Sequence, residues 1–117
     1  MTPAAGSAAG SGSVLVLAAL PNPVGEDRGN ESVTLLNTTP AAVPLTGWQL
    51  SDAAGASHTL SGSLAAGDTL RVTLTTAVQL GNRGDTIRLT DEHGTVIDEV
   101  TYQATDVHNG RTIAFRR

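Results

Sequence analysis

The sequence predicts an all-β domain, an antiparallel sandwich of about eight short strands. Three observations support this fold class. Hydrophobic and polar residues alternate in short runs, which is the period of a strand with one buried face. Turn-forming Gly, Pro, Asn and Asp residues separate these runs. In addition, no segment carries a helical repeat over about ten residues or more.

The expected strands in the first half of the chain are short. They are Val14–Ala19, Ser32–Leu35, Trp48–Leu50 and Ser57–Leu60. Pro21-Asn22-Pro23 marks the end of the first strand, Thr39-Pro40 follows the second, and Ala54-Gly55 separates the last two. The longest strongly apolar run, Val14–Leu20, has seven residues, whereas a membrane-spanning helix needs about twenty. We therefore expect no transmembrane segment.

The second half of the chain shows the clearest alternation, in the expected strand Thr69–Thr75. Leu70, Val72 and Leu74 share one face of this strand, which we expect to be buried, while the other face is polar. Three more expected strands follow, at Thr86–Thr90, Thr95–Tyr102 and Thr112–Phe115. Turn residues separate them at Ala66–Asp68, Asn82–Asp85 and His93-Gly94.

Length and composition fit one folded domain behind a short tether. The chain has 117 residues, of which 39% are hydrophobic and 15% charged, and domains of roughly 100–150 residues are the commonest. Residues 1–13 contain only Gly, Ser and Ala after Met-Thr-Pro, a composition typical of a flexible coil. We expect a tether over residues 1–13 and a β-sandwich over residues 14–117, as in a module of a larger chain.

The missing residue types exclude several mechanisms. All seven basic residues are arginine, so the chain has no Schiff-base lysine and no P-loop lysine. Cysteine is absent, which excludes disulfides, thiol nucleophiles and cysteine-ligated metals. His58, His93 and His108 lack the spacing of a zinc site, and no Gly-x-Ser-x-Gly motif is present. We therefore expect no enzyme and no catalytic residues.

The charge balance opposes binding to nucleic acid. Seven basic residues against eleven acidic ones give a net charge of -4, which repels phosphate backbones. Arg71 and Arg88 face outward on strands that look adjacent, and Arg111, Arg116 and Arg117 lie near the end of the chain. A small basic patch of these residues would bind DNA weakly and in a salt-sensitive way. Nucleic acid is thus an unfavoured partner, and a DNA-tethering domain stays an alternative.

Calcium is the metal with the best candidate residues. Asp27, Asn30 and Glu31 lie close together in one expected loop, and Ca²⁺ takes oxygen ligands from loops. The loop lacks the ligand spacing of an EF-hand, and Asp and Asn are common in turns for local reasons. We favour turn formation over calcium binding and expect no cofactor, with a calcium-dependent adhesion module as a further alternative.

Three polar or aromatic residues are predicted to have structural roles. Trp48 shares the strand face of Leu50, so a core position is favoured over an exposed ligand platform. Tyr102 shares the face of Val100, and we expect its ring inside and its hydroxyl on a backbone group. Asp98 has the same parity, and an inward carboxylate needs a hydrogen bond unless a bulge turns it outward. We interpret Asp98 as a structural acceptor rather than a catalytic acid.

Three motifs in a fixed order carry a family resemblance. They are Gly47-Trp48, Asn82-Arg83-Gly84-Asp85 and Asp98-Glu99-Val100-Thr101-Tyr102. Over about residues 14–115, the chain resembles the lamin tail domain family. The resemblance implies an immunoglobulin-like antiparallel β-sandwich of about seven to nine strands. It also implies that Asn82, Gly84 and Asp85 form a turn into the next strand, rather than an Arg-Gly-Asp ligand for integrins.

The resemblance implies a non-catalytic attachment module. The family occurs in nuclear intermediate-filament proteins and in bacterial exported proteins that carry hydrolases. No coiled-coil heptad repeat precedes the expected domain and basic residues are few, so we favour a bacterial-type member. We expect a secreted or cell-surface location and a protein or surface partner bound through loops or an edge strand. The isolated domain is expected to be a monomer.

Overall fold

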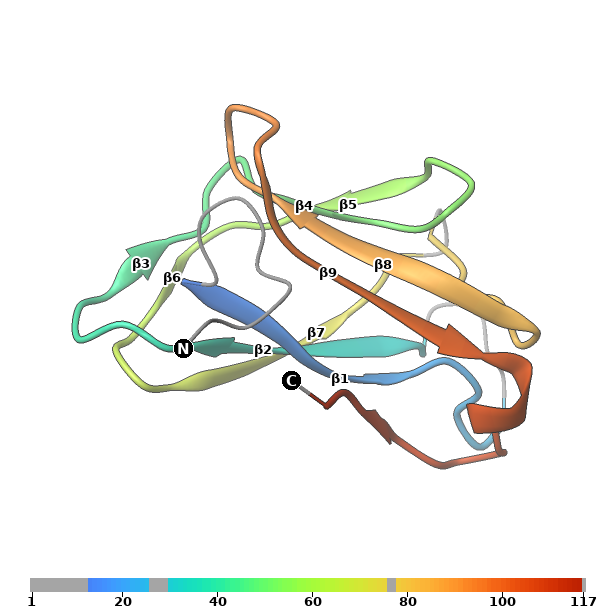
Figure 1. Ribbon diagram of the computed structural model, residues 1–117. Helices are drawn as coiled ribbons and strands as arrows, with labels where there is room; N and C mark the ends of the chain where they lie inside the picture. Colours follow the sequence, from blue (N-terminus) through green and yellow to red (C-terminus); the bar gives the residue numbers. More distant parts are fainter. Residues whose placement is uncertain (1–12, 26–29, 76–77, 117) are drawn as a thin grey trace.

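The strands form two four-stranded antiparallel sheets that face each other, in a computed structural model that describes residues 13–25, 30–75 and 78–116 (Figure 1). The first sheet has the order β10-β1-β2-β7 and the second the order β5-β4-β8-β9, with β3 and β6 paired beside them. The elements are β1 (Val14–Leu20), β2 (Ser32–Asn37), β3 (Val43–Pro44), β4 (Gln49–Ser51), β5 (Ser57–Thr59), β6 (Ser63–Leu64), β7 (Thr69–Thr73), β8 (Gly84–Thr90), β9 (Val96–Gln103), the 3-10 helix η1 (Ala104–Asp106) and β10 (Ile113–Ala114).

The predicted all-β sandwich is confirmed, and each of the eight expected strands has a counterpart. Two strands, β3 and β6, were not expected, because a ladder of two residues is too short to show alternation. The strand expected at Trp48–Leu50 is β4, which begins one residue later, so Trp48 lies just before it. The strand expected to run to Thr75 is β7, which ends at Thr73. The tether is predicted for residues 1–13, of which only Ser13 lies within the described residues.

β1 pairs with strands on both sides and carries a β-bulge in its ladder with β2. Val16 is opposite Leu35 of β2 and Ala18 is opposite Thr34, so Leu17 is the extra residue of the bulge. The Leu17 carbonyl accepts a hydrogen bond from the Phe115 N–H at 3.0 Å, next to the two-residue ladder with β10. The bulge thus attaches the C-terminal segment to the first sheet.

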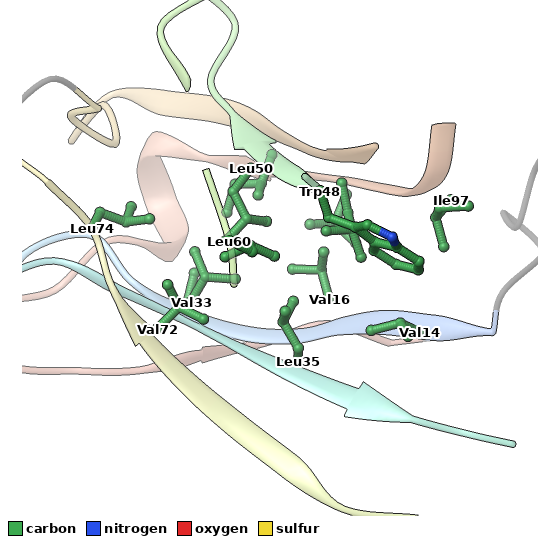
Figure 2. Packing of buried hydrophobic residues seen from close by; sticks show 14 of the residues in the cluster. Val14, Val16, Val33, Leu35, Trp48, Leu50, Leu60, Val72, Leu74 and Ile97 are labelled. Carbon is green, nitrogen blue, oxygen red and sulfur yellow. The ribbon is translucent and has the colours of Figure 1, made fainter. Parts of the chain in front are cut away.

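The core lies between the sheets and is built from Val, Leu and Ile around two aromatic rings. Figure 2 shows Trp48 and Leu50 from the second sheet facing Val14, Val16 and Leu35 from the first. Trp48 is 6% exposed, Leu50 is 1% exposed and Val14 is 0% exposed. Burial of this apolar surface is the main favourable term in folding. Across the described ranges, no helix is long and apolar enough to cross a membrane.

The prediction that Leu70 lies in the core is wrong. Leu70 has the inward parity of Val72, yet 36% of its surface is exposed, whereas Val72 is 8% exposed. The reason is the position of β7, which is the last strand of its sheet and has no partner on its outer side among the described residues. Alternation identifies which way a side chain points, but it does not say whether another element covers it.

Candidate functional site

Asp98 ties the two sheets together. It lies on β9 at the edge of the second sheet and is 0% exposed. Its Oδ2 accepts a hydrogen bond from the Val16 N–H of β1 at 2.7 Å, across the sandwich. Val16 directly precedes the bulge, where the ladder of β1 is interrupted. The side chain points inward as its parity predicts, and it has the backbone partner that a structural acceptor requires.

Asp85 holds the turn that leads into β8. Its Oδ1 accepts hydrogen bonds from the N–H groups of Ala53 and Thr86 at 2.9 and 2.8 Å. Its Oδ2 accepts a third from the Gly81 N–H at 2.9 Å. The carboxylate therefore joins the loop after β4 to both sides of its own turn. Because three backbone groups already occupy it, this geometry disfavours recognition of the Arg-Gly-Asp sequence by an integrin.

Tyr102 closes the same turn from β9. Its ring is 2% exposed and its hydroxyl donates a hydrogen bond to the Gly81 carbonyl at 2.6 Å. Burial raises the pKa of this hydroxyl well above its ordinary value, and the nearby negative charges of Asp85, Glu31 and Asp52 raise it further. A hydroxyl with so high a pKa stays protonated at physiological pH, so it acts as a donor and not as a base.

Glycine is required at the end of this turn, where β8 begins. Gly84 has a φ of +110°, and a Cβ atom there would lie 3.0 Å from the Tyr102 carbonyl oxygen. Asn82 is exposed on the outer side of the turn. The structure thus brings together Gly84, Asp85 and Tyr102, which the sequence predicts to be structural, and it places Trp48 and Asp98 elsewhere in the core.

The calcium candidates are not brought together into a site. Asp27 lies outside the described residues, Asn30 is exposed and Glu31 is 3% exposed. The Glu31 Oε1 accepts a hydrogen bond from the Leu80 N–H at 2.6 Å, and its carbonyl accepts another from the Leu74 N–H at 2.9 Å. Among residues 13–25, 30–75 and 78–116, no three His, Asp or Glu side chains gather as metal ligands. Glu31 instead holds the segment that leads from β7 to β8.

The histidines and arginines are also dispersed. His58 lies on β5, His93 between β8 and β9, and His108 after η1. The strands of Arg71 and Arg88 were expected to be adjacent, and this is wrong, because the two residues lie on different sheets and face opposite sides of the sandwich. The basic patch weighed as an alternative therefore cannot include both. Arg88 is also paired, since its Nη2 lies 2.6 Å from the Glu99 Oε2 on the neighbouring strand. Arg117 lies outside the described residues.

Asn37 is a buried polar hub that the sequence analysis missed. It is 0% exposed at the end of β2. Its Nδ2 donates hydrogen bonds to the carbonyls of Ala41, Leu64 and Ala65, and its Oδ1 accepts from the backbone and hydroxyl of Thr39. The run Asn37-Thr38-Thr39-Pro40 is the signal that could have revealed it, because Asn before Thr and Pro is typical of a side-chain-capped turn.

The outer side of β7 is one sheet edge where backbone groups make no hydrogen bond with the residues that the structure describes. The pairs Asn37 with Asp68 and Glu31 with Leu74 are hydrogen-bonded at the two ends of the ladder between β2 and β7. Because bonded and non-bonded pairs alternate in an antiparallel ladder, the backbone groups of Thr69, Arg71 and Thr73 point away from β2. Such a row can accept an added strand.

A comparison with protein-family models matches residues 7–104 of the chain to the Lamin Tail Domain. No curated protein matches the chain in a sequence comparison. The family match spans 98 residues, which is more than half of the chain and includes β1 to β9.

Proposed function

Because the chain belongs to the lamin tail domain family, whose members are non-catalytic immunoglobulin-like interaction domains, we propose that it is the binding module of a larger, exported bacterial protein. The bacterial assignment is supported by the low number of basic residues, and the exported location by the resemblance alone. The partner in this proposal is another protein, held by backbone and side-chain contacts on the surface of the sandwich.

The observation that carries the proposal is how three buried or half-buried carboxylates are used. Glu31, Asp85 and Asp98 each accept hydrogen bonds from backbone N–H groups. A general acid or base must instead direct its oxygen towards a substrate. These three carboxylates stabilise the fold, and the surface offers hydroxyl groups and open backbone.

The outer face of the second sheet supports the same function. Its exposed side chains include Gln49, Ser57 and Thr101, around the paired Arg88 and Glu99. A shallow groove of about 620 Å³ crosses this face and is lined mostly by polar and charged residues, with Arg88 and Glu99 among them. It lacks the apolar walls of a site for a small molecule. Contact with a macromolecule therefore suits the domain better than a small-molecule ligand.

Amide NMR of isotopically labelled protein tests this function. The spectrum is recorded with Ca²⁺, with a short DNA duplex and with peptides selected against the domain by phage display, all at fixed ionic strength. We expect localised shifts with the selected peptides alone. Shifts around Asn30 and Glu31 with Ca²⁺ would instead identify a calcium-dependent adhesion module. Salt-sensitive shifts with the duplex would identify a DNA-tethering domain, and either result overturns the proposal.

A further inference from the structure

We propose that β7 is the docking edge of this domain and that it takes an extended partner segment in which an acidic residue stands between two apolar ones. The inference rests on the proposed function, since it assigns the place and chemistry of the interaction. Three observations carry it: the unpaired backbone of β7, the exposed Leu70 side chain and the Arg71 guanidinium.

The two sheets have four edge strands, and they differ in what an added strand would meet. β10 and β5 have two and three residues, which is too short for a stable ladder. β9 has eight residues, but β1 approaches it closely enough for the hydrogen bond between Asp98 and Val16. An inward-pointing charge is also a device that protects sheet edges. β7 has five residues and pairs with β2 on one side, and within the described residues no strand pairs with its other side (Figure 1).

The backbone of β7 presents a row of hydrogen-bonding groups. The N–H and C=O of Arg71 and Thr73, and the C=O of Thr69, make no hydrogen bond with the described chain. The Thr69 N–H is already satisfied, since it donates to the Asp68 Oδ1 at 3.0 Å. The free groups alternate at the two-residue spacing of an antiparallel partner. A segment of about five residues would satisfy all of them.

The exposed side chain of Leu70 specifies the inner face of the partner. Leu70 is opposite Leu35, which is 0% exposed, yet Leu70 itself is 36% exposed. An added strand would place one apolar side chain beside Leu70 and another beside Val72. These side chains would extend the core past β7 and remove apolar surface from water. The partner is therefore apolar at the two positions that flank its centre.

Arg71 specifies the outer face. Its Nε donates to the Ser32 hydroxyl at 3.1 Å, which holds the guanidinium over the sheet and leaves the edge open. Arg71 forms no ion pair within the residues that the structure describes. A carboxylate opposite it would supply the missing charge, because opposite charges on directly facing residues stabilise a ladder. Pairing with a second copy over the full strand would instead place Arg71 opposite Arg71, which is unfavourable.

The probe is a blocked synthetic peptide, Thr-Val-Asp-Val-Thr, with its Thr-Val-Lys-Val-Thr counterpart as the charge control. Amide NMR titrations of the labelled domain should show shifts centred on Thr69–Thr73. The aspartate peptide should bind about two- to fivefold more tightly than the lysine peptide. The order should reverse in Arg71→Glu. Equal affinities that stay equal in this variant would overturn the recognition chemistry.

A matched pair of substitutions tests the backbone row. Thr73→Pro removes an N–H that faces away from β2, so the ladder inside the domain is kept. Thr73→Ala keeps the N–H and removes the same side chain. We expect Thr73→Pro to abolish binding and Thr73→Ala to retain it, with both variants folded by the dispersion of their spectra. If Thr73→Pro fails to fold, the charge reversal with Arg71→Glu decides.

The outcomes separate this inference from the function on which it rests. Shifts that map to β5, to β9 or to the loops would overturn the assignment of β7 while leaving a peptide-binding module. Absence of binding by either peptide at millimolar concentration would overturn the recognition chemistry as well. Dimerisation through β7, seen as concentration-dependent shifts without peptide, would replace the acidic partner with a second copy. Binding of Ca²⁺ or DNA would overturn the function itself.

Discussion

Two buried carboxylates, Glu31 and Asp98, and the half-buried Asp85 connect separate segments of this domain. Glu31, Asp85 and Asp98 each accept backbone N–H groups from another part of the chain, at 2.6 to 2.9 Å. Hydrogen bonds to a charged acceptor are stronger than those between neutral groups, and a buried donor left without an acceptor lowers the stability of the fold. The chain has no cysteine, so these contacts connect distant segments without the disulfides that many small domains use.

Replacing Asp98 should show how much one such carboxylate contributes to the stability of the fold. Asp98→Ala leaves the Val16 N–H without this acceptor inside the core, and we expect the free energy of unfolding to fall by about 1–3 kcal/mol. Chemical denaturation measures this loss. Glu99→Ala is the matched control, because it removes an adjacent carboxylate whose ion pair with Arg88 is exposed. That pair should contribute less than about 1 kcal/mol. An equal loss of unfolding free energy in the two variants would contradict the structural role of Asp98.

Trp48 should be the largest single side chain in the energetics of the core. Its indole is 6% exposed against both sheets (Figure 2). Trp48→Ala is expected to lower the free energy of unfolding by about 3–5 kcal/mol, through lost burial and an unfilled cavity. Leu70→Ala, at the exposed edge, should cost less than about 1 kcal/mol. An unchanged melting temperature in Trp48→Ala would contradict the core position.

At the scale of the elements, the turn from Gly81 to Asp85 leads from the segment after β7 into β8. Gly84→Ala should therefore lower the free energy of unfolding by about 1–3 kcal/mol, since φ is positive and the new Cβ would crowd the Tyr102 carbonyl. Gly55 has a φ of +94° with nothing within 4 Å of its Cβ position. Gly55→Ala should cost only about 1 kcal/mol. Denaturation curves in which the two variants lose equally would show that the close contact is unimportant.

The strands could be predicted because alternation and turn residues are local signals. Val33 and Leu35 alternate with polar neighbours, and β2 formed where that pattern lies. The two-residue strands β3 and β6 could not be predicted, because their pairing depends on partners that are distant in the sequence. The exposure of Leu70 and the separation of Arg71 from Arg88 have the same cause. The order of the strands in each sheet determines both, and a short stretch of sequence carries no information about that order.

The candidate site shows the same limit. Asp98 was predicted to point inward and to need a partner, but nothing nearby in the sequence identifies Val16 as that partner, 82 residues away. Asn37 was missed because its role depends on Leu64 and Ala65, which arrive from another part of the chain. The docking edge on β7 likewise appears only once β2 is known to be its single neighbour.

At the scale of the whole molecule, the composition leaves a single tyrosine as the side chain that titrates at alkaline pH. The chain has one tyrosine, no cysteine and no lysine, and arginine stays charged to above pH 12. Between about pH 9 and 12, Tyr102 is therefore the side chain expected to change its charge. Unfolding exposes the hydroxyl, whose ordinary pKa is about 10, whereas burial raises the pKa in the folded state.

The sign of the resulting pH dependence follows from this difference in pKa. Below about pH 10 both states hold the proton, and the free energy of unfolding is independent of this group. Above that pH the unfolded state releases the proton first, so the domain should lose about 1.4 kcal/mol of stability per pH unit until the folded hydroxyl also ionises. Urea unfolding at several pH values, with tyrosinate absorbance followed in parallel, measures the slope.

Tyr102→Phe provides the control for the alkaline slope. The variant loses the hydrogen bond to the Gly81 carbonyl, so its free energy of unfolding should be lower by about 1 kcal/mol at neutral pH. It should then stay level between about pH 9 and 12, because its remaining side chains do not titrate there. The two curves are expected to cross as the wild type declines. A variant that declines in parallel with the wild type would show that alkaline unfolding comes from the net charge of the chain and not from this buried hydroxyl.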